Sequence, residues 1–147
     1  MILLDTNVLS AMMQVVPDEI ITRWLDQQPR ESIWITTITV MEISAGLRAM
    51  PASKKRSALA DALAKLLGEK IQGRIATFDI PAAEEAAELM ARRKLKGRPV
   101  DSRDTMIAGI AQASRATLVT RNTSHFSDLS VPVINPWQQI HLGGRTG

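Results

Sequence analysis

Residues 1–10 read MILLDTNVLS, and the expected fold is worked outward from this stretch. Apolar side chains fill positions 1–4 and stop at Asp5, a pattern typical of a short buried strand that ends in a turn. A short helix is expected directly after the turn. No basic segment precedes the apolar run, and Asp5 interrupts it, which argues against a signal peptide. The stretch predicts a strand at Met1–Leu4 with an aspartate at its carboxyl end.

The rest of the chain alternates between helical and extended patterns. Further strands are expected at Ser32–Ile38, Arg74–Phe78, Thr117–Thr120 and Val131–Ile134. Helices are expected at Pro17–Gln28, from the cap Thr39 to about Met50, and at Ser53–Gly68, Pro81–Lys96 and Arg103–Ser114. Strands separated by helices predict an α/β fold, in which helices cover both faces of a parallel sheet. Ligands bind beyond the carboxyl ends of such strands, where Asp5 and Asn122 are expected to lie.

Composition indicates one globular domain and excludes several kinds of site. The chain has 147 residues, no internal repeat and no linker, so residues 1–140 are expected to form one domain and residues 141–147 a flexible tail. The absence of cysteine excludes disulfides and cysteine-bound zinc, and two histidines are too few for a histidine-built metal site. No stretch approaches the roughly 18 apolar residues of a membrane span, so no membrane partner and a cytoplasmic location are expected.

Charge gives a weak indication of the partner. The net charge of +3 and the sequence pI of about 9.7 favour a nucleic acid slightly. Basic residues gather in two segments, which are ordinary solvated helix faces in one interpretation and contacts to nucleic acid in the other. The segments are Lys54, Lys55 and Arg56, and Arg92, Arg93, Lys94, Lys96 and Arg98.

Asp5, Glu42 and Asp104 are the candidate catalytic residues, and each has a structural alternative. Asp5 can cap the helix that follows it. A phosphatase of the haloacid dehalogenase type also begins with such an aspartate, but it needs a second one two residues on, where this chain has Asn7. Glu42 can complete a capping box with Thr39, and Asp104 can complement a helix dipole.

Taken together, the three carboxylates favour a metal site. They lie in separate segments, each at the end of a predicted strand or the start of a predicted helix. Clustered carboxylates repel one another unless a cation offsets their charge. Oxygen ligands without histidine or cysteine suit Mg²⁺ or Mn²⁺, the usual cations beside phosphate groups.

Four ordered motifs give the chain a resemblance that covers Met1 to about Trp137. MILLDTNVLS, TTITVMEISAGL, RDTMIAGIA and the final LVTRNTSHF with VINPW resemble the PIN-domain ribonucleases, and among them the VapC/FitB toxins of bacterial toxin–antitoxin pairs. The resemblance implies a PIN-like three-layer α/β/α sandwich with a mostly parallel central sheet, and a homodimer. It also implies an RNA substrate, an antitoxin partner that mediates any contact with DNA, and Mg²⁺ or Mn²⁺ bound by Asp5, Glu42 and Asp104.

The chain departs from the family pattern at Asn122, where many members carry a fourth acidic residue. An amide offers an oxygen ligand without charge, so binding of a second metal ion is in question. Asn122 is still a candidate catalytic residue, because its amide can orient a water. Asp101, a further supporting candidate, or Asp128 can compensate for the missing charge. Thr6, Thr120, Arg103 and Arg121 are candidate supporting residues for the carboxylates or for substrate phosphate.

Two functions follow from this interpretation. The first is hydrolysis of RNA, in which the bound metal activates a water and stabilises charge on the phosphate, in a growth-inhibiting toxin. The alternative is a catalytically impaired PIN-fold protein that acts as corepressor in a DNA-bound toxin–antitoxin complex. Met12, Met13 and Trp24 are candidates for the antitoxin groove, with a place in the core as the alternative.

Overall fold

The computed structural model describes residues 1–99 and 101–138. Its centre is a sheet of five strands in the order β3-β2-β1-β4-β5, with every neighbouring pair parallel. The strands are β1 (Ile2–Leu4), β2 (Ile33–Thr36), β3 (Ile75–Ala76), β4 (Thr117–Val119) and β5 (Val133–Ile134). The predicted parallel sheet is therefore confirmed, with short strands whose carboxyl ends share one edge.

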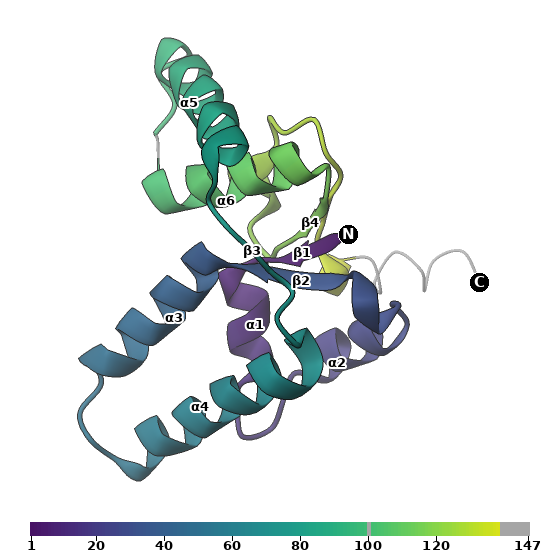
Figure 1. Cartoon of the computed structure of the whole chain (residues 1–147), viewed down its shortest axis with the longest axis vertical. Coiled ribbons are helices and arrows are strands. Elements are labelled where there is room, and N and C mark those ends of the chain that lie inside the picture. The colour runs from purple at the N-terminus through teal and green to yellow at the C-terminus, as the bar shows by residue number, and fades with distance from the viewer. Residues whose placement is uncertain (100, 139–147) are drawn as a thin grey trace.

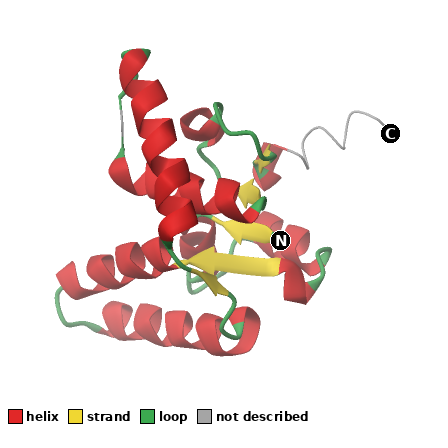
Figure 2. Ribbon diagram, turned by 45° about the horizontal axis from the view of Figure 1, so that its top comes forward, coloured by secondary structure: helices red, strands yellow, loops and turns green. Residues whose placement is uncertain are grey.

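Helices cover the sheet on both sides, which makes three layers (Figures 1 and 2). One layer holds α1 (Thr6–Met12), α2 (Glu19–Asp26), α3 (Thr37–Ala49) and α4 (Lys54–Lys65). The other holds α5 (Ile80–Leu95) and α6 (Ser102–Ser114). Short helical turns complete the described chain: η1 (Arg30–Ser32), the π-helical η2 (Leu66–Ile71) and η3 (Thr123–Phe126). The predicted three-layer sandwich is confirmed.

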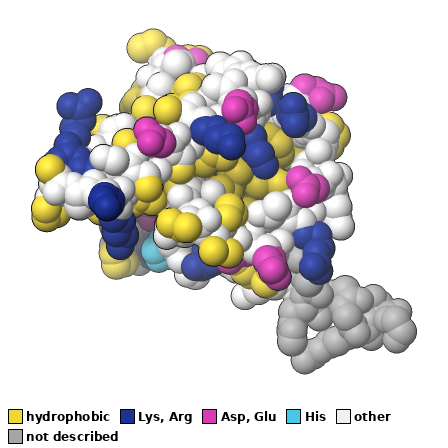
Figure 3. All heavy atoms as spheres, turned by 90° about the horizontal axis from the view of Figure 1, so that it is seen from below, with side chains coloured by type: hydrophobic (Ala, Val, Ile, Leu, Met, Phe, Trp, Pro, Cys, Tyr) yellow, Lys and Arg dark blue, Asp and Glu magenta, His cyan; other side chains and the backbone are white. Residues whose placement is uncertain are grey.

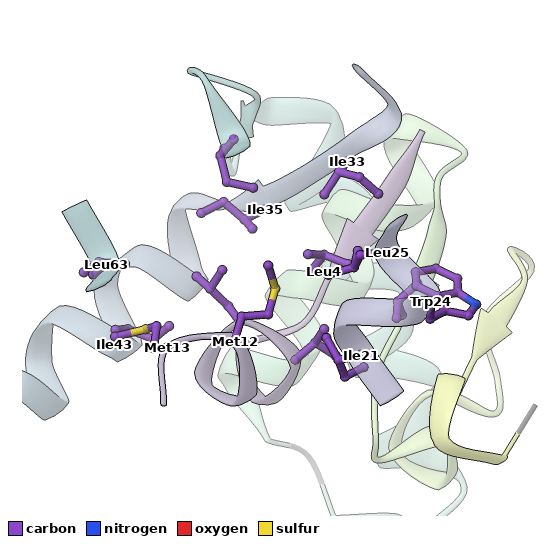
Figure 4. Packing of buried hydrophobic residues seen from close by; sticks show 14 residues of the cluster. Leu4, Met12, Met13, Ile21, Trp24, Leu25, Ile33, Ile35, Ile43 and Leu63 are labelled. Carbon is purple, nitrogen blue, oxygen red and sulfur yellow. The ribbon is translucent and has the colours of Figure 1, made fainter. Parts of the chain in front are cut away.

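The alternation of side chains along β1 supplies both cores. Leu3 and Leu4 are fully buried on opposite faces of the sheet, as the twofold period of a strand requires. Leu4 packs in a cluster with the α1–α4 layer, and Figure 4 shows it among side chains from these helices and β2. Leu3 packs in a second cluster with α5 and α6. Two adjacent leucines thus tie both helical layers to the central strand.

Several boundaries differ from the sequence prediction, and the predicted strand Arg74–Phe78 is reduced to β3 at Ile75–Ala76. Strand β2 ends at Thr36, whose hydroxyl caps α3, so this helix begins earlier than predicted. Pro17 lies outside α2, because the Asp18 carboxylate caps that helix. The predicted helix Ser53–Gly68 is regular to Lys65 and then widens into η2. The last strand covers only Val133–Ile134 of its predicted range.

Helices α5 and α6 pack closely because α6 carries Gly109 at their contact. A Cβ on Gly109 would lie 2.5 Å from the Ala82 carbonyl oxygen and 2.8 Å from the Ala86 Cβ. Such distances leave no room for a side chain. The close packing holds the first turn of α6, with Asp104, at a fixed depth beside the sheet.

Within residues 1–99 and 101–138, no helix is both long enough and apolar enough to cross a bilayer. The predicted tail at 141–147 lies outside the described residues.

Candidate active site

Asp5 lies where β1 ends and α1 begins, and it serves both structures. Its Oδ1 accepts a hydrogen bond from the Thr6 backbone N–H at 2.8 Å, so it caps α1 as the structural alternative proposed. Its Oδ2 accepts the Thr120 hydroxyl at 2.8 Å, across from the end of β4. Thr120 is fully buried and Asp5 nearly so. Two neighbouring parallel strands therefore fix the orientation of this carboxylate.

Glu42 makes a contact that differs from the predicted capping box. Thr36, not Thr39, caps α3, and the Glu42 Oε1 accepts the Thr6 hydroxyl at 2.8 Å. The prediction was wrong because α3 starts three residues earlier, which places Glu42 in its second turn with its side chain free to reach α1. Arg103 lies 3.7 Å from the Glu42 Oε2. Thr6 and Arg103, both proposed as supporting residues, therefore contact this glutamate.

Asp104 lies in the first turn of α6, and its carboxylate contacts a residue that the sequence analysis missed. Asp101 caps α6 by accepting the Asp104 backbone N–H at 2.9 Å, so its carboxylate is engaged as a helix cap. His125 in η3 places Nδ1 3.0 Å from the Asp104 Oδ2. The sequence signal for His125 was its place three residues after Asn122 in the last motif. The sequence analysis considered the histidines only as metal ligands and so did not consider His125 as a hydrogen-bond partner of a carboxylate.

One pocket of about 700 Å³ brings the three candidate carboxylates together. Asp5, Glu42 and Asp104 all line it, and so do Asn122 and Arg121. It opens at the carboxyl edge of the parallel sheet, where a ligand site was expected. Four segments that are distant in the sequence thus contribute to one concave surface.

The electrostatics of the pocket fit a cation. Burial raises the pKa of Asp5 above 3.8, hydrogen bonds from Thr120 and Thr6 act against this rise, and the charges of Asp104 and Glu42 add to it. An ionised Asp5 is therefore costly as long as no positive charge offsets it. The donors are carboxylate oxygens, which match the preference of Mg²⁺ and Mn²⁺.

Among the described residues, no three acidic, histidine or cysteine side chains form a closed set of metal ligands. Mg²⁺ is usually held by one or two carboxylates and keeps several of its waters, so such a group of three is not required for its binding. The oxygen chemistry of the pocket suits a hydrated divalent ion, and Asp5, Glu42 and Asp104 are the residues that would hold it.

Arg93 and Asp128 correct two predictions. Arg93 was predicted, with its basic neighbours, to lie either on a solvated helix face or at a nucleic-acid contact, but its side chain is buried. Its Nε and Nη2 each donate to an Asp128 carboxylate oxygen at 2.8 Å, and Nη1 donates to the Thr105 hydroxyl at 3.0 Å. Asp128 is therefore engaged in an ion pair, and it does not line the pocket as a substitute for the missing fourth carboxylate.

The candidates for an antitoxin groove also need correction. Met12, Met13 and Trp24 are buried in the core between the α1–α4 layer and the sheet. Figure 4 shows Trp24 beside Leu25 on one side of the cluster, Met12 in the middle, and Met13 beside Ile43 on the other side. The amphipathic pattern of these helices predicted apolar faces correctly, but this chain buries those faces itself.

Comparison with known proteins settles the family. The sequence profile of the PIN domain matches residues 2–131. The chain belongs to the PIN domain family. The matched residues include Asp5, Glu42 and Asp104 and cover most of the chain.

Two curated relatives align along almost their whole length with this PIN domain. It is 38% identical over 138 residues to a protein named VapC ribonuclease Y4jK of Sinorhizobium fredii, covering 94% of this chain and 99% of the relative. It is 35% identical over 137 residues to a protein named Toxin FitB of Neisseria gonorrhoeae, covering 93% and 99%.

Solved structures agree with the fold. FitAcB from Neisseria gonorrhoeae superposes with a TM-score of 0.83 at 35% identity, covering 93% of this chain and 99% of that one. VapBC2 from Rickettsia felis, bound to a DNA fragment from its promoter, superposes with a TM-score of 0.78 at 27% identity, covering 92% and 98%. The three-layer arrangement of this PIN domain is thus the one found in these complexes.

Proposed function

We propose that this PIN domain is a metal-dependent ribonuclease and the toxin of a toxin–antitoxin pair. The observation that carries the proposal is the meeting of Asp5, Glu42 and Asp104 in one pocket at the carboxyl edge of the sheet. The names of the relatives, a VapC ribonuclease and Toxin FitB, support the activity and the biological role.

The chain's own residues would orient the reacting groups. A divalent ion held by Asp5, Glu42 and Asp104 would supply a positive charge that stabilises the developing phosphate charge. The Thr6 hydroxyl keeps Glu42 turned toward Asp5, and His125 restrains Asp104. Carboxylates in the pocket are the groups available to accept a proton from the attacking water. The amide of Asn122, at the pocket wall, can orient a water but adds no charge.

An RNase assay with matched variants tests the activity. The wild-type protein should cleave RNA in Mg²⁺ or Mn²⁺ and lose this activity with a chelator. Asp104→Asn should lower cleavage by at least about a hundredfold, because a neutral amide removes charge from the metal site. Asp61→Asn is the control, since Asp61 is exposed on α4, outside the pocket. Equal cleavage by the two variants would contradict the assignment of Asp104.

The alternative is a binding protein that represses transcription together with its antitoxin on DNA. The DNA-bound VapBC2 complex gives this alternative a structural precedent. The three carboxylates are all present here, which favours turnover over a decayed site. If no RNA is cleaved with either metal while the antitoxin complex still binds promoter DNA, the corepressor interpretation replaces the ribonuclease.

For the antitoxin we propose the groove between α1, α3 and α4. Its volume is about 370 Å³, and its apolar wall includes Met13, Ile43, Leu47, Met50 and Leu59. Met13, although buried, is therefore the one of the three earlier groove candidates that contributes to this wall. Thr6 and Glu42 line both this groove and the carboxylate pocket, so a segment in the groove reaches the site. Figure 3 looks onto this helical layer and shows hydrophobic side chains gathered over it, with basic ones among them. An amphipathic antitoxin segment with a basic residue for the carboxylates matches this surface.

Gly46 offers a test of the groove that leaves the core unchanged. It lines the groove, and a Cβ there would meet no atom within 4 Å. Gly46→Trp should therefore fold normally but block the antitoxin, as measured by calorimetry with the purified partner. Gly68→Trp is the control, because its Cβ also meets nothing and it lies outside the groove. Unchanged antitoxin affinity of Gly46→Trp would place the antitoxin elsewhere.

The expected homodimer stays a prediction, which light scattering tests.

A further inference from the structure

Arg121 and Trp137 form a stacked pair at the edge of the carboxylate pocket. The guanidinium carbon of Arg121 lies 3.8 Å from the centroid of the Trp137 ring. A cation at this distance over an indole face is attracted to it, and the stack restricts the arginine side chain. Arg121 lines the pocket, whereas Trp137 is half-buried against the α1–α4 core. An exposed arginine is thus fixed in place where it would otherwise sample many rotamers.

Both members of the pair are also held through their backbones. The Asn135 side chain donates to the Arg121 carbonyl at 3.3 Å and accepts the Trp137 backbone N–H at 3.0 Å. The Asn7 side-chain oxygen accepts the Arg121 N–H at 3.1 Å. The Trp137 indole N–H donates to the Asp18 carboxylate at 3.2 Å. Asn7, Asp18 and Asn135 therefore position the stack relative to α1, α2 and the end of β5.

The guanidinium N–H groups remain available for a ligand. Within residues 1–99 and 101–138, the Arg121 side chain has no hydrogen-bond acceptor and no ion pair within 4.0 Å; besides the ring contact it has a longer-range attraction to the Asp18 carboxylate. Stacking occupies the face of a guanidinium and leaves its donors free in the plane, in the geometry that grips two phosphate oxygens. The stack is therefore a preorganised donor group facing a pocket.

Charge identifies the ligand. Arg121 is the only basic residue among the described residues that line the pocket, whose other charged residues are Asp5, Asp18, Glu42 and Asp104. An RNA backbone entering such a pocket is repelled wherever no cation is present. We propose that the Arg121–Trp137 stack binds a backbone phosphate of the RNA next to the scissile one, and so determines how the strand enters the site. The inference rests on the proposed ribonuclease function.

The test measures RNA binding apart from cleavage. Asp104→Asn serves as the background, and a short fluorescent oligoribonucleotide of mixed sequence in Mg²⁺ is the probe. Arg121→Gln should weaken binding about tenfold, because a charge-assisted bond is lost. It should also reduce the salt dependence of binding by about one charge. Arg121→Lys keeps the charge but not the planar donors, and Trp137→Leu removes the ring. Both variants should bind RNA more weakly than the Asp104→Asn background but more tightly than Arg121→Gln.

Arg30→Gln is the matched control, since Arg30 is exposed and precedes β2, at the opposite edge of the sheet. If Arg121→Gln binds RNA no worse than Arg30→Gln, the inference is overturned. It is also overturned if Arg121→Gln only lowers the Tm, which would make the pair a structural strap, or weakens only antitoxin binding. A wild-type protein that neither binds nor cleaves RNA would refute the proposed function itself. If the wild-type protein cleaves RNA and the Arg121 variants bind RNA as tightly as their background, only the inference about the stack is refuted.

Discussion

Asp128→Asn should destabilise the protein strongly, because it leaves the buried Arg93 guanidinium without its counter-ion. The side chains of Arg93 and Asp128 are 5% and 17% exposed, and their closest ion-pair distance is 2.8 Å. Removing one partner of a buried pair costs about 3–5 kcal/mol. Arg93 would keep the Thr105 hydroxyl and the His125 carbonyl as acceptors, so we expect the lower end, about 3 kcal/mol.

The assay is thermal unfolding followed by circular dichroism, with Asp61→Asn as the exposed control. A loss of about 3 kcal/mol corresponds to a fall in Tm of about 10 °C for a chain of this size. Because Arg93 also holds η3, which carries His125 onto Asp104, RNase activity measured well below the Tm should fall as well. A Tm within about 1 °C of the control would refute the reasoning, since surface charges have effects of that order.

The pH dependence provides a second check. The hydrogen bonds and charge of Arg93 lower the pKa of Asp128 below 3.8. A carboxylate with a lowered folded-state pKa stabilises the protein above its unfolded-state pKa and loses this effect as the pH falls through the folded-state value. The gap in stability between wild type and Asp128→Asn should therefore be full at neutral pH and narrow below about 3.8. A gap that stays constant into acid would mean that the pair contributes through shape, not charge.

Three further predictions concern the site and the helical layers. With a chelator present, Asp5→Asn should raise the Tm at neutral pH, because burial raises the pKa of Asp5 and its ionised form destabilises the fold. This gain in Tm over the wild-type protein should vanish as the pH falls toward 3.8, and a gain that persists there would contradict the cause. Asn122→Asp should strengthen Mn²⁺ binding or add a second ion in titration calorimetry, whereas unchanged affinity and stoichiometry would exclude position 122 from the metal site. Gly109→Ala should lower the free energy of unfolding by about 1–3 kcal/mol, because the added Cβ would lie 2.5 Å from the Ala82 carbonyl oxygen. Gly46→Ala is the control: an added Cβ there has no atom within 4 Å, so the same assay should show no loss of stability.

The sequence by itself determined the order of helices and strands. It also determined that the acidic residues lie at the end of a strand or near the start of a helix. These features depend on local patterns: an apolar run stopped at Asp5, the period of each helix, and caps within three residues. The parallel sheet follows from the alternation of elements, and its common carboxyl edge is where Asp5 and Asn122 were expected. Asp5, Glu42 and Asp104 were expected together because their oxygen ligands and the motif resemblance indicated one metal site. The four motifs then predicted the PIN fold, which the structure and the comparisons confirm.

Only the tertiary structure decided which side chain each of these residues contacts. Glu42 receives a hydroxyl from Thr6, 36 residues away, although Thr39 was the predicted local partner. Thr120 reaches Asp5 across 115 residues. Arg93, which looks like one more charge in a basic run, is buried because Asp128 lies opposite it after the chain has passed through α6 and β4. Periodicity shows which face of a helix turns inward. The partner on that face depends on how the layers pack, and no local sequence pattern encodes which distant residue will lie opposite.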